Sequence, residues 1–307
     1  MIRVGLAGCG RWGRLILRDL RALNCEVVVA VPSEEGRRAA LGAGAERVLG
    51  HVRDLPECDA YVVAVPTVSH AEVVLELAAR GRPLFCEKPL TADVHSARRI
   101  VDTAGERVFV MDKWRYHPGV HLLRDMAKSQ ELGPVQGIHA TRVQWGCPHA
   151  DVDPVWILMP HDLSIALEIL GDLPTPTLAN AESDAHGLTT LTAWLDGPVW
   201  MHSEVGVRSP RHRRVIELRC RDGVAMLGDA YDEHVAVLRT DGRTAGQPAP
   251  DWERRPFAAT MPLLDELACF VAYAAGTGPA PKSSAHEGLR IVETIAQIRA
   301  LAGLGGR

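Results

Sequence analysis

The sequence predicts an α/β protein in which a doubly wound parallel sheet is followed by an α+β region with an open, mostly antiparallel sheet. In the first half, short apolar runs alternate with segments that have helical apolar spacing. A glycine-rich turn of the form GxGxxG stands directly after the first apolar run and before the first helical segment. From His139 onward, apolar and polar residues alternate one by one, as in strands with a single buried face. These three observations predict the two-part fold class.

Five strands and three helices are predicted to alternate in the first half. The apolar runs expected to form strands are Ile2–Ala7, Val27–Val31, Ala60–Val65, Pro83–Cys86 and Val108–Met111. The segments with helical spacing are Arg14–Leu23, about His70–Arg80 and Asp93–Thr103. Short strands that alternate with helices of about ten residues indicate a parallel sheet covered on both faces.

The glycine turn Gly8-Cys9-Gly10-Arg11-Trp12-Gly13 has the sequence context of a dinucleotide-binding fingerprint. In such a fingerprint Gly8 makes the tight turn, Gly10 lets the backbone approach a pyrophosphate, and Gly13 allows close packing of the helix on the strand. The helix N-terminus then offers unpaired N–H groups to the phosphates. The simpler interpretation is a strand–helix turn without a ligand. We expect a Rossmann domain that binds NAD or NADP.

The end of the second strand bears on the choice between these two cofactors. An acidic residue that binds the ribose 2′-hydroxyl of NAD normally stands there, but this chain has Val31-Pro32-Ser33. Ser33 with Arg37 and Arg38 suits a 2′-phosphate, because guanidinium groups bind phosphate in bidentate fashion. Glu34 and Glu35 leave NAD open, and the two arginines could equally form a solvated helix face. The sequence favours NADP over NAD.

The strand Pro83–Cys86 is followed by Glu87-Lys88-Pro89. Ligands of open α/β sheets bind beyond the carboxyl ends of the strands, so Lys88 is expected near the nicotinamide. A lysine there can stabilise negative charge on a substrate oxygen during hydride transfer. A surface lysine before a turn-forming proline is the alternative.

Several motifs along the chain resemble those of the Gfo/Idh/MocA oxidoreductases. The stronger matches are GCGRWG (Gly8–Gly13), VPTVSH (Val65–His70), GRPLFCEKPL (Gly81–Leu90) and PHDLSIALEILG (Pro160–Gly171). The weaker matches are SPRHRRVIELRCRDG (Ser209–Gly223) and PLLDELACFVAYAAGTGPAP (Pro262–Pro281). The resemblance implies a Rossmann domain, a second domain with an open sheet, and NAD(P)-dependent oxidation or reduction of a carbon of a sugar, sugar nucleotide or cyclic polyol.

The resemblance also implies roles for individual residues. Lys88 and His161 are expected to be catalytic, with Lys88 polarising the reacting oxygen and His161 as the acid/base. The cofactor-binding set comprises Gly8, Gly10, Arg11, Trp12, Gly13, Pro32, Ser33, Arg37, Pro66, Thr67, His70, Glu87 and Lys88. The expected substrate contacts are Lys88, Arg115, His117, His161 and Asp162. The chain departs from many relatives at Ile157, where they place an aspartate that pairs with the histidine.

The segment around His161 is expected to open a helix. Because proline is tolerated only in the first turn, Pro160 predicts that the helix begins close to His161. Gly171 would end this helix, and Asp162 would compensate its dipole. His161 would then project from the first turn into a cleft. A polar cap on a buried helix is the alternative, and Asp151 or Asp153 could replace the missing aspartate.

The predicted domains are residues 1–118 and 119–282, with a helix at about 283–303 that packs near the first domain. The open sheet of the second domain needs a cover, and a second copy of the chain would supply one. We therefore expect a homodimer or homotetramer, an inference that also rests on the family.

Other classes of site and partner were weighed against this interpretation. Cys147, His149, Asp151 and Asp153 lie close together in sequence, but their spacing matches no standard zinc pattern, and we expect no metal site. The net charge of −4 gives no electrostatic reason to expect nucleic acid or an anionic membrane as a partner. Scattered cysteines without a CxxC pair and the lack of a long apolar run favour a soluble, cytoplasmic protein.

Two other functions stay open beside the dehydrogenase. The chain could be an NAD(P)-binding sensor or regulator without turnover. It could also be a hydrolase or lyase that uses bound NAD transiently.

Overall fold

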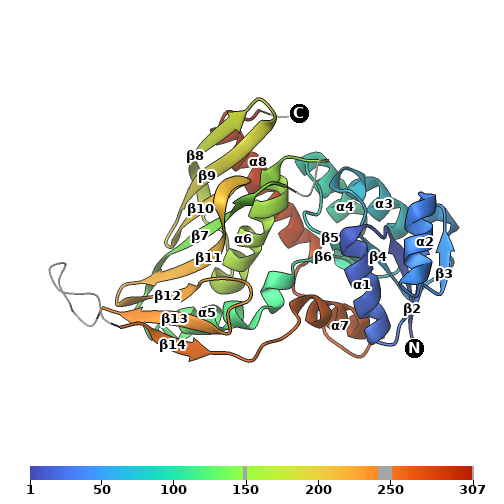
Figure 1. Cartoon of the computed structure of the whole chain (residues 1–307), viewed down its shortest axis with the longest axis horizontal. Helices are drawn as coiled ribbons and strands as arrows, with labels where there is room; N and C mark the ends of the chain where they lie inside the picture. Colours follow the sequence, from blue (N-terminus) through green and yellow to red (C-terminus); the bar gives the residue numbers. More distant parts are fainter. Residues whose placement is uncertain (148–150, 241–250, 306–307) are drawn as a thin grey trace. The chain divides into compact units, whose positions relative to one another are not determined.

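The computed structural model describes residues 1–147, 151–240 and 251–305. The chain forms two compact units, which are described separately here. The first comprises Met1–Lys113 and Met261–Glu293, and the second comprises Trp114–Thr260 and Thr294–Arg307. Figure 1 traces the course of the chain through both units.

The first unit contains a six-stranded, fully parallel sheet in the order β3-β2-β1-β4-β5-β6. The strands are β1 (Arg3–Ala7), β2 (Glu26–Ala30), β3 (Arg47–Leu49), β4 (Ala60–Val63), β5 (Leu84–Glu87) and β6 (Val108–Met111). The five strands predicted from the sequence are all present, and β3 is an addition that its three residues were too short to reveal. The strand order reverses between β1 and β4, which is the switch point where ligands of such sheets bind.

Helices connect these strands. They are α1 (Arg11–Ala22), α2 (Glu34–Gly42), α3 (His70–Ala78) and α4 (Val94–Ala104), with short 3₁₀ turns at η1 (Val52–Asp54), η2 (Thr67–Ser69), η3 (Gly105–Arg107) and η4 (Lys113–Tyr116). The α4 helix begins as expected, because the side chain of Asp93 accepts a hydrogen bond from the Ser96 backbone N–H at 2.7 Å. Ser33 caps α2 in the same way through the Gly36 N–H, at 3.1 Å.

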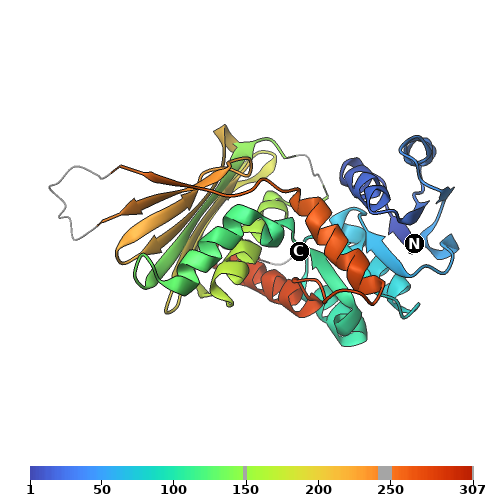
Figure 2. The same cartoon turned by 90° about the horizontal axis from the view of Figure 1, so that it is seen from below.

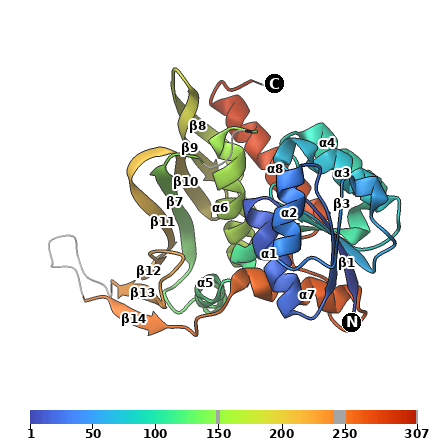
Figure 3. The same ribbon diagram turned by 45° about the vertical axis from the view of Figure 1, so that its right-hand side comes forward.

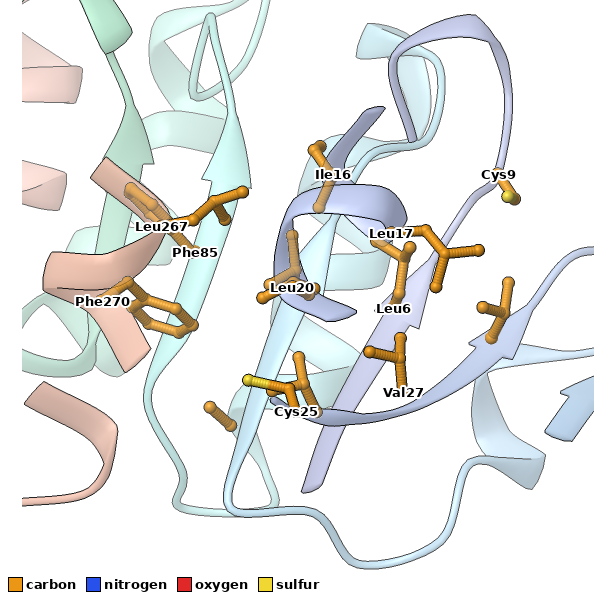
Figure 4. Packing of buried hydrophobic residues seen from close by; sticks show 14 of the residues in the cluster. Leu6, Cys9, Ile16, Leu17, Leu20, Cys25, Val27, Phe85, Leu267 and Phe270 are labelled. Carbon is orange, nitrogen blue, oxygen red and sulfur yellow. The ribbon is translucent and has the colours of Figure 1, made fainter. Parts of the chain in front are cut away.

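The helix α7 (Pro262–Ala274) belongs to the first unit although it comes late in the chain. Its Leu267 and Phe270 are fully buried, and the Phe270 ring stacks on Phe85 of β5 with 4.8 Å between centroids. Figure 4 shows these residues beside Leu20 of α1. The sequence-based boundaries placed α7 in the second domain, whereas its apolar face covers β5 and α1 in the first unit. The helix α8 (Ala285–Leu301) begins in the first unit and ends in the second.

The second unit is built on an eight-stranded sheet in the order β14-β13-β12-β11-β7-β10-β9-β8. Its strands are β7 (Val135–Trp145), β8 (Thr175–Asp184), β9 (Gly187–Asp196), β10 (Trp200–Gly206), β11 (Arg208–Cys220), β12 (Gly223–Leu227), β13 (His234–Arg239) and β14 (Glu253–Pro256). Among the strand pairs that the structure describes in this second sheet, β7 and β10 pair in parallel and all the others are antiparallel. The fold class predicted from the sequence is confirmed.

The two faces of this sheet differ. The helices α5 (Pro118–Ser129) and α6 (Pro154–Leu170) lie along one face, as Figures 2 and 3 show. Met201 and Ser203 of β10 point to that face and are fully buried, whereas His202 and Glu204 alternate with them and stay partly exposed. In the part of the chain that the structure describes, no helix covers the second face.

The α6 helix does not begin where the sequence predicted. It begins at Pro154, with the Asp153 side chain accepting from the Val155 N–H at 3.0 Å, and Pro160 lies inside it. The expected start near His161 is therefore wrong. A proline inside a helix removes one backbone hydrogen bond, but nearly every residue of α6 is buried, and this packing offsets the loss. The predicted end at Gly171 is confirmed, since Gly171 adopts a positive φ of 79°.

Membrane insertion through a helix finds no support in the described ranges, where none of the helices combines the length and the hydropathy of a span.

Candidate cofactor loop and active-site residues

The three glycines of the loop after β1 have three different environments. Gly8 has a φ of +92°, and a Cβ atom there would lie 2.3 Å from the Ala64 carbonyl oxygen. A Cβ on Gly13 would lie 2.6 Å from the Gly8 carbonyl oxygen, so this glycine lets α1 pack against the strand end. A Cβ on Gly10 would meet no heavy atom of the described chain within 4 Å. Only Gly10 thus borders open space, where a ligand can approach the backbone.

The rest of this loop fits an anion-binding role. Gly10 is the N-cap of α1 and contributes no side chain to its first turn, so the helix N–H groups keep their capacity for phosphate oxygens. Arg11 is exposed at the helix start. Trp12 packs against the core, and the ammonium group of Lys113 lies 4.9 Å from its ring centroid. The residues present here fit a dinucleotide pyrophosphate.

The residues expected to read the ribose already have contacts within the chain. Ser33 caps α2 through its hydroxyl, and Pro32 is exposed. The Arg37 guanidinium donates to the Pro32 carbonyl oxygen at 2.6 Å and pairs with Glu34 at 2.5 Å. Arg38 is exposed. The end of β2 therefore offers an exposed arginine, an arginine tied to Glu34, and no carboxylate at the usual position.

His70 ties the loop after β4 to the loop after β5. Its side chain is buried, with Nδ1 2.8 Å from the Pro89 carbonyl oxygen and Nε2 3.0 Å from the Val65 carbonyl oxygen. Burial lowers the pKa of its imidazole, and its hydrogen bonds to the backbone oppose that shift. Pro66 and the buried Thr67 lie in the short segment between Val65 and His70. His70 thus links the Glu87-Lys88-Pro89 segment to the loop after β4.

Glu87 and Lys88 lie at the carboxyl end of β5, as expected. Both are half-buried, and the Lys88 backbone N–H donates to the Glu87 carboxylate at 3.2 Å. Burial raises the pKa of Glu87 to about 7, although the positive charges of Lys88 and Lys113 oppose that shift. A carboxyl group with such a pKa can gain or lose a proton near neutrality.

His161 lies in the middle of α6 and is half-buried. Because α6 is continuous, Ile157 lies one turn before His161 on the same side of the helix. Ile157 is buried, with 5% of its surface exposed, and it brings no charge to the imidazole.

Asp162 belongs to a buried polar group that joins α6 to the sheet. Its carboxylate accepts from Arg142 Nε at 2.7 Å and from the Ser203 hydroxyl at 3.3 Å. The Arg142 guanidinium also lies over the Trp114 ring, 4.8 Å from its centroid. Burial raises the pKa of Asp162, and Arg142 opposes that effect. We call Arg142, Asp162 and Ser203 the α6 anchor.

The expected role of Asp162 in compensating the helix dipole is wrong, because it lies in the middle of α6 and its oxygens are held by the α6 anchor. Asp153 is engaged as well, since it caps α6 and forms an ion pair with Arg299. Of the two acids considered as replacements for the missing aspartate, Asp153 is thus held by other contacts.

The two remaining substrate candidates, Arg115 and His117, have structural contacts. Arg115 is buried, and its Nε lies 3.2 Å from the Glu168 carboxylate. His117 is the N-cap of α5, where its Nδ1 accepts from the Gly119 N–H at 3.1 Å, and its Nε2 lies 3.1 Å from the Ala230 carbonyl oxygen. These contacts explain both residues without a ligand.

A metal centre finds no support in the described ranges, where no group of three histidine, cysteine or acidic side chains could hold an ion. His149 of the sequence cluster lies outside the described residues.

The comparisons with known proteins agree with this geometry. The model of the oxidoreductase family with an NAD-binding Rossmann fold, Gfo/Idh/MocA, matches residues 2–111, the segment that carries the glycine loop and Lys88. Over these residues the chain is similar to the Gfo/Idh/MocA oxidoreductases. This finding confirms the resemblance drawn from the motifs.

Several curated proteins with names from this family are similar to the chain. The rhizopine catabolism protein MocA of Rhizobium meliloti is 32% identical over 139 residues, which are 43% of this chain and 44% of that protein. An inositol 2-dehydrogenase of Saccharopolyspora erythraea is 31% identical over 55% of this chain and 54% of its own length. The matches thus span about half the length of these two relatives. An inositol 2-dehydrogenase of Streptomyces avermitilis is 26% identical and covers more, 82% of this chain and 79% of its own length.

Solved structures share the fold over the whole chain. A UDP-N-acetylglucosamine 3-dehydrogenase of Acidithiobacillus ferrooxidans aligns with a TM-score of 0.81 and 22% identity, over 99% of this chain and 98% of its own. A levoglucosan dehydrogenase solved with NADH and levoglucosan aligns with a TM-score of 0.84 and 16% identity, over 99% and 97%.

The sequence analysis did not identify Glu266 of α7, which lies near Glu87 at the carboxyl end of β5. It is buried, with 1% of its surface exposed, and interacts electrostatically with Glu87. The signal was present, because Leu263, Glu266, Leu267 and Phe270 follow the spacing of a buried helix face and Glu266 is the charged exception.

Proposed function

We propose that this chain is an NAD(P)-dependent dehydrogenase or reductase that transfers hydride between nicotinamide and a carbon of a sugar, sugar nucleotide or cyclic polyol. The observation that carries the proposal is the open space beside Gly10 at the N-terminus of α1, framed by two glycines that no other residue could replace without a clash. Relatives named for inositol, levoglucosan and UDP-N-acetylglucosamine support the substrate class.

In this proposal Lys88 and His161 act at the same substrate oxygen. Lys88 follows the last residue of β5 and would donate a hydrogen bond that stabilises charge on the oxygen. His161 would take up the hydroxyl proton, a task suited to an imidazole whose ordinary pKa of about 6.5 lies near working pH. The bound nicotinamide supplies the hydride chemistry. The protein supplies position and charge.

We further propose a preference for NADP over NAD. The usual carboxylate is missing at the end of β2, and Arg38 is exposed close by on α2. Arg37 would have to exchange its pairing with Glu34 for a 2′-phosphate. The uncovered face of the second sheet is proposed as the contact between copies in a homodimer or homotetramer.

Titration of the intrinsic fluorescence with NADH and NADPH tests binding and preference together. We expect both to bind, with NADPH at least about tenfold tighter, a difference worth about 1.4 kcal/mol. Tighter binding of NADH would refute the NADP preference and leave the fold-based proposal intact.

Turnover is then measured with inositol, levoglucosan and UDP-N-acetylglucosamine while NAD(P)H absorbance is followed. With an active substrate, Lys88→Ala and His161→Ala should each lower kcat by about 10²-fold or more. Activity that survives both substitutions would exclude the proposed roles. Cofactor binding without turnover of any such compound would favour a sensor. Turnover with a tightly retained cofactor and no net absorbance change would favour a hydrolase or lyase.

A further inference from the structure

Glu266 is the one charged residue among the buried residues of α7 that the structure describes. It lies on the buried face of α7 between Leu263 and Phe270, with 1% of its surface exposed. Its Oε2 atom has no hydrogen-bond partner among the described residues. A buried carboxyl group of this kind is costly unless it is neutral, so its presence needs a reason.

The packing of α7 on β5 directs Glu266 toward Glu87. Phe270 stacks on Phe85, with 4.8 Å between centroids and 25° between the ring planes. Glu87 follows Phe85 by two residues, on the same side of β5, and Glu266 precedes Phe270 by one helical turn. The two carboxyl groups therefore lie near each other, next to the stacked rings. Glu266 interacts electrostatically with Glu87 and also with Asp112.

We call Glu87, Asp112 and Glu266 the acidic cluster. Two lysines face it: Lys88 from the loop after β5 and Lys113 from the end of β6. The ammonium group of Lys113 also lies over the ring of Trp12, which belongs to the glycine loop. Asp112 and Glu266 are both buried, at 1% exposure. Three carboxyl groups with two ammonium groups in such a place favour the retention of at least one proton.

Two members of the acidic cluster have raised pKa values, but to different extents. Burial, with the negative charges of Glu87 and Asp112, raises the pKa of Glu266 well above its ordinary value. Burial raises the pKa of Glu87 to about 7. The acidic cluster thus changes its charge by one unit close to neutrality, with Glu87 as the group that titrates.

We propose that the acidic cluster senses the charge of the nicotinamide ring: it releases a proton to solvent when the oxidised, positively charged ring binds, and it regains that proton when the bound ring becomes neutral on reduction. This inference rests on the proposed function. Glu87 ends β5 at the carboxyl edge of the sheet, where the nicotinamide of a bound dinucleotide is expected. A positive ring nearby favours the ionised form of Glu87. When reduction removes the charge of the ring, the protonated form is favoured again.

Calorimetric titration of the oxidised and the reduced dinucleotide in two buffers of different ionisation enthalpy measures the protons exchanged. At pH 7 a group with a pKa of about 7 is half protonated. We expect up to about half a proton to be released when the oxidised form binds, and a much smaller exchange when the reduced form binds. The ratio of the Kd for the oxidised form to the Kd for the reduced form should fall about threefold to tenfold between pH 6 and pH 8.5.

Three variants locate the exchanged proton. Glu87→Gln should abolish the exchange and make the Kd ratio independent of pH. Glu266→Gln, which mimics the neutral acid, should keep the exchange. Asp265→Asn is the matched control, because it removes a half-buried carboxylate from the same helix and should behave as the parent protein does.

Two results would overturn the proposal: binding of the oxidised dinucleotide without proton release in the parent protein, or a release that persists in Glu87→Gln. Failure of either dinucleotide to bind would instead refute the proposed function, so the two failures are distinguishable.

Discussion

The acidic cluster of the first unit and the α6 anchor of the second both bury carboxyl groups, but they surround them differently. In the α6 anchor, Asp162 has a guanidinium at 2.7 Å and a hydroxyl at 3.3 Å. In the acidic cluster, Glu266 faces two further carboxyl groups, and its Oε2 has no hydrogen-bond partner in the described chain. A buried carboxylate that is paired with a guanidinium stabilises the fold. A buried carboxyl group among other carboxyl groups has a shifted pKa, so its protonation can change with pH or with a bound ligand.

The largest effect is expected from removing the paired acid. Asp162→Ala should lower the free energy of unfolding by about 3–5 kcal/mol, because it leaves the buried Arg142 guanidinium without its counter-charge. Urea denaturation measures the loss. The control is Asp125, an exposed acid that pairs with Arg124, and Asp125→Ala should cost under about 1 kcal/mol. Equal losses in the two variants would mean that the α6 anchor does not stabilise the fold.

Substitutions at two glycines of the cofactor loop should have different effects, one on stability and the other on dinucleotide binding. Gly8→Ala should cost about 3 kcal/mol or more, since its φ is +92° and the new Cβ would clash with the Ala64 carbonyl. Gly10→Ala should change stability by under about 1 kcal/mol, because nothing in the described chain lies near its Cβ, yet weaken dinucleotide binding about tenfold or more. Thermal unfolding and fluorescence titration of both variants check the contrast. Unchanged affinity in Gly10→Ala would show that the ligand does not approach this backbone.

Neutralising the unpaired acid should stabilise the protein, in contrast to Asp162→Ala. The folded-state pKa of Glu266 is raised above its unfolded value, so its contribution to stability is present at low pH and is lost as the pH rises above the unfolded pKa of about 4.5. Glu266→Gln removes this loss. We expect a gain of about 1–2 kcal/mol in the free energy of unfolding at pH 8 and almost none at pH 4.5. A variant that is less stable than the parent protein at pH 8 would contradict the raised pKa of Glu266.

The same contrast explains what could be predicted from the sequence. The glycine loop, the strand alternation and the position of Lys88 follow from local patterns, since each depends on residues a few positions apart. The start of α6 could not be predicted in this way. Considered alone, Pro160 indicates the start of a helix, but the burial of nearly the whole helix allows Pro160 to lie within it. Glu266 joined Glu87 only through the stacking of Phe270 on Phe85, a contact between residues far apart in the chain.

The smallest effect concerns the second partner of Asp162. Ser203→Ala removes a buried hydroxyl and its 3.3 Å hydrogen bond, which should cost about 1 kcal/mol in the free energy of unfolding. The hydroxyl also lowers the pKa of Asp162, whereas burial raises it. Without it the folded-state pKa rises further above the unfolded value, so the loss should be larger at pH 8 than at pH 4.

Urea denaturation of Ser203→Ala at these two pH values measures the difference. The control is Ser209→Ala, which removes a half-buried hydroxyl from β11 outside the α6 anchor and should show no such pH dependence. A loss in Ser203→Ala that is the same at both pH values would mean that the hydroxyl acts on packing alone. In that case Arg142 by itself would hold Asp162 ionised, and the α6 anchor would reduce to a single ion pair.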